Sequence, residues 1–231
     1  MKKLWPWTWR IVLTLLLCLF LYELWFFAHI ARWVKHNPST SAFMDQRLLK
    51  MQSKNPDAEL RHQWVPYAKI SKNLKRALIA SEDAKFVNHE GFDWAGIQKA
   101  YEKNLRKGKV VAGGSTISQQ LAKNLFLSTQ RTPWRKAEEA LITIMLEKIM
   151  TKQRIFEIYL NVIEWGNGVF GAEAAARHYY RVSAAQLSPE QAAKLAAMVP
   201  DPRYYDQHRE APGMLRKSQI ILKRMNSAKI P

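Results

Sequence analysis

A long apolar stretch near the N-terminus constrains this chain more than any other feature of its sequence. Residues 11–30 read IVLTLLLCLFLYELWFFAHI and contain one charged side chain, Glu23. A helix of about 20 apolar residues is long enough to cross the hydrocarbon core of a bilayer. Tryptophans, which favour membrane interfaces, lie near both ends of the stretch. They are Trp5, Trp7, Trp9, Trp25 and Trp33.

We predict a retained transmembrane helix at 11–30 rather than a cleaved signal peptide, because no small-residue cleavage site follows the stretch. The basic residues near its ends are Lys2, Lys3 and Arg10 on one side and Arg32 and Lys35 on the other. The positive-inside count is therefore nearly balanced. The short segment 1–10 favours a cytoplasmic N-terminal tail, with the rest of the chain on the other side of the membrane.

The balance of charges indicates the kind of partner. The formal net charge is +17, which suits an anionic partner such as nucleic acid, an acidic membrane surface or a phosphorylated substrate. The only cysteine, Cys18, lies within the apolar stretch. The sequence therefore predicts neither an internal disulfide nor a cysteine-based metal site.

The remaining chain reads as a connector followed by one helical domain. Turn-forming clusters at 37–41 and 55–57 indicate a connector over 31–66. From residue 67 to 231, helix-start signals recur and alternating strand patterns are scarce, so the class is mainly α. The expected caps are Ser71, Asp93, Thr132, Thr151 and Ser188, with Gly108 ending one helix.

A first polar motif begins with the pair Glu82-Asp83 and continues through Phe86 and His89 to Gly91. A carboxylate in suitable surroundings can act as a general base near neutral pH. A solvated acidic helix end has the same pattern, and this stretch alone favours that simpler interpretation.

A second motif follows the glycine pair at 113–114. Its polar members are Ser115, Thr116, Gln119, Gln120, Lys123 and Asn124. A capped helix start with a lysine one to two turns in could hold a phosphate. It is not a nucleotide-binding loop, because no Gly-Lys-Ser/Thr follows the glycines. An ordinary amphipathic helix with a polar face explains the pattern equally well.

Two further motifs are ambiguous when taken singly. Arg135 and Glu139 are four residues apart, so a simple intrahelical salt bridge worth about 0.3–0.5 kcal/mol explains them. Lys136 lies next to that pair. The run YLNVIEWG at 159–166 and the alanine-rich segment after it read mostly as core.

The motifs become specific when they are taken in order. Between about Lys69 and Tyr205, the order and spacing of five motifs resemble those of the peptidoglycan glycosyltransferase family. The motifs are EDxxFxxHxG, GGSTISQQxxKN, RKxxE, YLNxxEWG and GxxxAAxxYY. This family includes the transglycosylase domain of class A penicillin-binding proteins, and the short chain resembles its monofunctional members. No Ser-x-x-Lys motif occurs, so we expect no acylating serine site.

The resemblance implies a lysozyme-like, two-lobed helical domain with a cleft, acting on lipid II and the growing glycan chain. Glu82 matches the family's general base, and Glu139 matches its second glutamate. Lys123, Arg135 and Lys136 match residues that contact the donor phosphates. The remaining matched substrate-binding positions are Asp83, Phe86, His89, Ser115, Thr116, Gln119, Gln120 and Asn124.

The resemblance also carries expectations about location and partners. It implies a single-pass protein of the bacterial inner membrane with its catalytic domain in the periplasm, in contact with membrane lipid. It allows a divalent cation, Mg or Mn, at Glu139 without requiring one, and implies no organic cofactor. Other wall-synthesis or division proteins are open as partners, and no nucleic acid is expected.

Two other functions fit part of the pattern. A glycan hydrolase could use the same two carboxylates, but it has no need for cations that bind a pyrophosphate. A basic, non-enzymatic membrane scaffold would suit the charge, but it would leave the ordered carboxylate and amide motifs unexplained.

Overall fold

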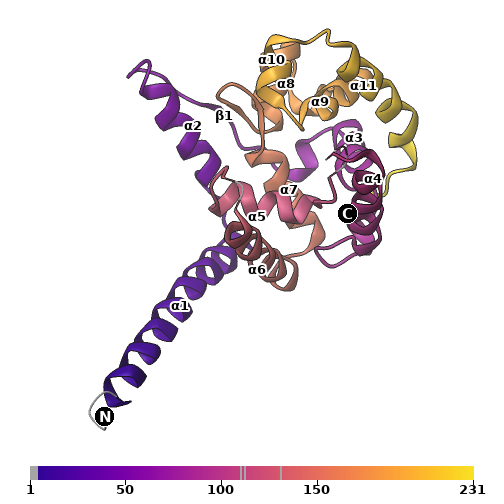
Figure 1. Cartoon of the computed structure of the whole chain (residues 1–231). Coiled ribbons are helices and arrows are strands. Elements are labelled where there is room, and N and C mark those ends of the chain that lie inside the picture. The colour runs from indigo at the N-terminus through magenta and orange to yellow at the C-terminus, as the bar shows by residue number, and fades with distance from the viewer. Residues whose placement is uncertain (1–4, 110, 112, 131) are drawn as a thin grey trace. The chain divides into compact units, whose positions relative to one another are not determined.

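The computed structural model describes residues 5–109, 111, 113–130 and 132–231, and these residues are mainly helical, as expected (Figure 1). Lys2 and Lys3, which enter the positive-inside count, and the side chain of Trp5, one of the interface tryptophans, lie outside the described residues. The α-helices are α1 (Trp5–Trp33), α2 (Ala42–Gln52), α3 (Lys72–Glu82), α4 (Trp94–Lys107), α5 (Ile117–Phe126), α6 (Pro133–Ile149), α7 (Lys152–Val162), α8 (Ala172–Tyr180), α9 (Pro189–Met198), α10 (Pro202–Gln207) and α11 (Pro212–Arg224).

Short strands and single 3-10 turns complete the described elements. They are β1 (Arg61–His62), β2 (Glu164–Gly166), β3 (Val169–Phe170), η1 (Tyr67–Lys69), η2 (Phe86–Asn88), η3 (Ala184–Gln186) and η4 (Met225–Ser227). The sheet order is β1-β3-β2, with β1 parallel and β2 antiparallel to the central strand.

Helix α1 is longer than the predicted 11–30 segment at both ends. Its stretch from Trp7 to Trp33 is long and apolar enough to cross a membrane, and only 6% of its apolar window is buried. A core helix of a soluble protein would be mostly buried, so the exposure agrees better with a membrane helix. The described residues up to Asn37 form one of two compact units.

The second unit begins at Pro38, well before the expected domain start at 67. The segment expected as a connector contains α2 and β1, and α2 packs against α5. Ser41 begins α2, because its Oγ accepts a hydrogen bond from the Met44 amide at 3.3 Å. Much of the predicted connector therefore belongs to the folded unit.

The expected helix starts are largely confirmed at the level of single hydrogen bonds. Ser71, Thr132 and Thr151 each accept a bond from a first-turn amide, at 3.1–3.2 Å. Ser188 forms a reciprocal capping box with Gln191. Asp93 precedes α4 without such a side-chain bond, and Gly108 ends that helix in the left-handed conformation, at φ +61°.

Packing of the helices brings separate motifs together. Helix α5 packs against α6 and α7, while α9 packs against α3 and α11. As a result, the polar side of α5, the start of α6 and the strand β2 line one cleft, and a hydrogen bond from Gln120 of α5 joins it to Glu82 at the end of α3. Each contributes one of the motifs recognised in the sequence.

Candidate active site

Glu82 is the last residue of α3 and lies among hydrogen-bond donors. Its Oε1 accepts from the Ser81 hydroxyl at 2.8 Å, and its Oε2 accepts from Gln120 Nε2 at 3.1 Å. The Lys217 ammonium lies 3.4 Å from Oε1. The Glu82 side chain is 10% exposed, so it is held by the protein but remains accessible.

The orientation of Gln120 is fixed by a buried tyrosine. The Tyr159 hydroxyl donates to Gln120 Oε1 at 2.9 Å. Burial raises the pKa of Tyr159, and the charges of Glu82 and Asp83 add to that effect, so the phenol remains a donor. Because the amide oxygen of Gln120 is taken, its Nε2 is directed to Glu82.

Asp83 has a different environment from its neighbour. It is the residue that ends α3, and its side chain is only 2% exposed. Its carboxylate accepts two bonds from His89 Nε2, at 2.9 and 3.0 Å, and one from the Ile117 amide at 3.0 Å. Asp83 therefore connects the first motif to the N-terminus of α5, where a negative charge is favourable.

We expect Asp83→Asn to reduce stability rather than to remove the reacting group. Asparagine has one acceptor oxygen where the carboxylate has two, so its NH2 group is placed at Oδ1 against His89 Nε2 or at Oδ2 against the Ile117 amide, and a buried donor is left unpaired at a cost of about 1–3 kcal/mol. For a chain of this size that corresponds to a fall of about 2–12 °C in melting temperature. Circular dichroism of the detergent-solubilised full chain measures it, and an unchanged melting temperature would contradict this structural role.

Other members of the first two motifs are buried and stabilise the segments that carry the site. Phe86 is fully buried, with its ring centroid 5.6 Å from that of Phe156. Thr116 and Gln119 are buried and form the capping box of α5, and the Thr116 hydroxyl also donates to the Gly91 carbonyl at 2.6 Å. These residues were expected at the substrate. In the structure Phe86 packs in the core, and the polar groups of Thr116 and Gln119 hold the start of α5, which carries Gln120, Lys123 and Asn124 of the cleft lining.

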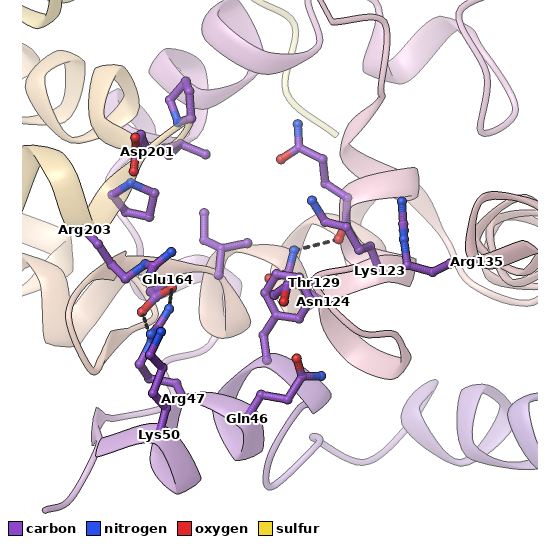
Figure 2. Close-up of a pocket in the computed structure, with 16 residues that line it drawn as sticks. Gln46, Arg47, Lys50, Lys123, Asn124, Thr129, Arg135, Glu164, Asp201 and Arg203 are labelled. Atoms are coloured by element: carbon purple, nitrogen blue, oxygen red, sulfur yellow. Dashed lines mark hydrogen bonds and ion pairs between the residues drawn. The ribbon is translucent and has the colours of Figure 1, made fainter. Parts of the chain in front are cut away.

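A cleft of about 630 Å³ lies beside Gln120 (Figure 2). Its lining residues are Phe43, Gln46, Arg47, Lys50, Gln120, Lys123, Asn124, Thr129, Arg135, Ile163, Glu164, Val199, Pro200, Asp201, Pro202 and Arg203. Figure 2 shows Lys123 and Arg135 on one side of the pocket and Arg47, Lys50 and Arg203 on the other. Cations outnumber carboxylates in this lining, which favours an anionic ligand.

Glu139 lies behind the basic side of this cleft. It is buried, and it accepts from Arg135 Nη1 at 2.6 Å and from Lys136 Nζ. The predicted Arg135–Glu139 pair is confirmed, and Arg135 also lines the cleft. Lys136 is not among the cleft-lining residues; its ammonium lies 3.5 Å from the Oγ of exposed Ser115.

Glu139, where the resemblance allows a divalent cation, is already paired with cationic side chains of the protein. Both of its carboxylate oxygens already bind cationic side chains. Among the described residues, no group of three or more histidine, cysteine, aspartate or glutamate side chains comes together in a way that could hold a metal ion. A divalent cation at Glu139 stays a prediction.

The motifs do not indicate Arg47 and Arg203 in the cleft or Lys217 beside Glu82, and Glu164 lies in the run YLNVIEWG, which reads mostly as core. Arg47 and Glu164 form a two-pronged ion pair at 2.5 and 3.0 Å, joining α2 to β2 across the cleft wall. These partners are 117 residues apart, so no local spacing indicates them. Lys217, on α11, has no motif around it in the sequence.

The helical fold and this site define an enzyme class: a carboxylate held by donors, next to a cationic cleft, fits a transferase that acts on an anionic substrate. The family model for transglycosylases matches residues 47–226, so the chain belongs to the transglycosylase family and is a glycosyltransferase.

Curated relatives extend the similarity to nearly the whole chain. A protein of Methylobacillus flagellatus named biosynthetic peptidoglycan transglycosylase is 70% identical, over 96% of this chain and 97% of its own length. Proteins with the same name in Chromobacterium violaceum and Dechloromonas aromatica are 66% and 61% identical. The first of these two is matched over 96% of this chain and 97% of its own length, and the second over the full length of both.

Proposed function

We propose that this protein builds peptidoglycan by polymerising lipid II into β-1,4-linked glycan strands, with release of undecaprenyl pyrophosphate. The observation that carries the proposal is the position of Glu82. Gln120 connects it by one hydrogen bond to a cleft whose wall contains Lys123 and Arg135. A base and a set of cations for a leaving group are therefore close together.

In the proposed reaction, Glu82 takes the proton of the 4-hydroxyl on the acceptor's GlcNAc. The resulting oxygen nucleophile attacks the anomeric carbon of the growing chain, and the bond to lipid pyrophosphate breaks with inversion. Lys123 and Arg135 bind the pyrophosphate as negative charge develops on it, through charge-assisted hydrogen bonds. Gln120 holds Glu82 in place for the proton transfer.

Incubation of the detergent-solubilised full chain with lipid II, followed by separation of the products by size, tests this function. We expect polymer longer than the disaccharide unit and release of lipid pyrophosphate. Shortening of preformed glycan without polymer formation would instead support the hydrolase alternative. Absence of both reactions would support a scaffold and overturn the proposal.

We also propose a single-pass topology in the inner membrane, with α1 retained and residues 31–231 in the periplasm. The support is the exposed, apolar surface of α1 together with a substrate that is itself anchored in lipid. A reporter enzyme fused after Pro231 should be active only in its periplasmic form. Activity of a cytoplasm-dependent reporter at that position would contradict the topology. Growing glycan, membrane lipid and further wall-synthesis proteins are the partners that this location allows.

A further inference from the structure

A second hollow of about 460 Å³ continues the cleft. Its lining residues are Arg47, Lys50, Met51, Lys54, Asn167, Asp201, Arg203, Tyr204 and Gln207. Arg47, Lys50, Asp201 and Arg203 also line the first cleft, so the two spaces adjoin. Gln120, Lys123 and Arg135 line only the first. The second hollow, which we call the outer groove, is thus separate from the residues next to Glu82.

The outer groove has an excess of positive charge. Arg47 is compensated by its ion pair with Glu164. In the part of the chain that the structure describes, no salt bridge joins Lys50, Lys54 or Arg203 to a carboxylate. Asp201 is the one carboxylate in the described lining. Like charges gathered around a concave surface attract an anion.

The proposed reaction supplies two kinds of anion. The pyrophosphate is already provided for at Lys123 and Arg135, in the part of the cleft nearest Glu82. The other anions are carboxylates of the peptide that is attached to each disaccharide of lipid II and of the growing glycan chain, called the stem peptide. Uncharged hydrogen-bonding groups in the outer groove, from Asn167, Tyr204 and Gln207, suit a peptide-bearing sugar better than a compact phosphate.

We propose that the outer groove binds the stem-peptide carboxylates of the growing glycan chain through Lys50, Lys54 and Arg203. This inference rests on the proposed function and adds a contact with the peptide part of the substrate. Lys54 is the most selective probe, because it lines the outer groove and not the first cleft. Lys223, an exposed lysine on α11, provides the matched control.

The test compares lipid II carrying the native peptide with lipid II whose peptide carboxylates are converted to amides. Full-length parent, Lys54→Ala, Arg203→Ala and Lys223→Ala proteins are assayed in detergent for KM and kcat. We expect KM for native lipid II to rise about two- to fivefold with each groove variant, with kcat retained. The same variants should show the parental KM on the amidated substrate, and Lys223→Ala should match the parent on both.

Equal losses on both substrates would show that these cations bind a phosphate, and would overturn the assignment to peptide. Parental KM values for both groove variants on native lipid II would overturn it as well. In either case polymerisation by the parent protein would leave the proposed function standing. If the parent made no polymer, both proposals would fall together. Lys54→Gln, which keeps a long polar side chain, distinguishes loss of charge from loss of folding.

Discussion

Glu82→Gln is expected to remove nearly all polymerisation, with a loss of about 10²–10⁴-fold in kcat. Glutamine keeps the size of the side chain, and its amide oxygen can accept from Gln120 while its NH2 group donates to the Ser81 hydroxyl, but it cannot take the proton of a sugar hydroxyl. The melting temperature should stay close to that of the parent, because the Glu82 carboxylate is not part of the core. Product sizing with lipid II measures the activity, and calorimetry or circular dichroism measures stability.

Asp83→Asn is the matched control for this experiment. It changes the adjacent carboxylate, which the structure directs to His89 and Ile117 instead of the cleft. We expect it to lose stability while retaining more activity per folded molecule than Glu82→Gln. The reverse pattern, with full activity in Glu82→Gln and none in folded Asp83→Asn, would assign the base to Asp83.

Removal of a cation from the cleft should have the second-largest effect. Lys123→Ala or Arg135→Ala should each lower kcat/KM by about 10- to 150-fold. Loss of a hydrogen bond to a charged group costs about 1.5–3 kcal/mol, and each 1.4 kcal/mol corresponds to about a tenfold change. Steady-state kinetics with lipid II measure it.

Lys136→Ala is the matched comparison, because Lys136 also binds Glu139 but does not line the cleft. Its loss should be clearly smaller than that of Arg135→Ala. Parental rates in both Lys123→Ala and Arg135→Ala would exclude a role for this side of the cleft in binding the leaving group.

Local sequence patterns predicted the helices well and the neighbours of each side chain less well. Ser71, Thr132 and Ser188 begin helices as expected, since a cap depends on residues within one turn. Only part of the polar face predicted for α5 lines the cleft. Gln120 and Lys123 face the cleft, whereas Thr116 is buried at the helix start.

The parts that could not be predicted depend on contacts between distant segments. Arg47 lies in a segment that turn signals assigned to a connector, yet its ion pair with Glu164 makes α2 a wall of the cleft. Lys217 reaches Glu82 from α11, 135 residues further along the chain. Such pairs are set by helix packing, and a single sequence has no periodicity that reports them.

The chain of hydrogen bonds from Tyr159 through Gln120 to Glu82 also affects how much free energy is needed to orient these groups for the proposed reaction. Each polar end of the Gln120 amide has its partner within the protein, so neither the amide nor the carboxylate needs substrate to orient it. In the proposed reaction, the free energy of orienting these groups is therefore supplied by folding and does not add to the activation barrier.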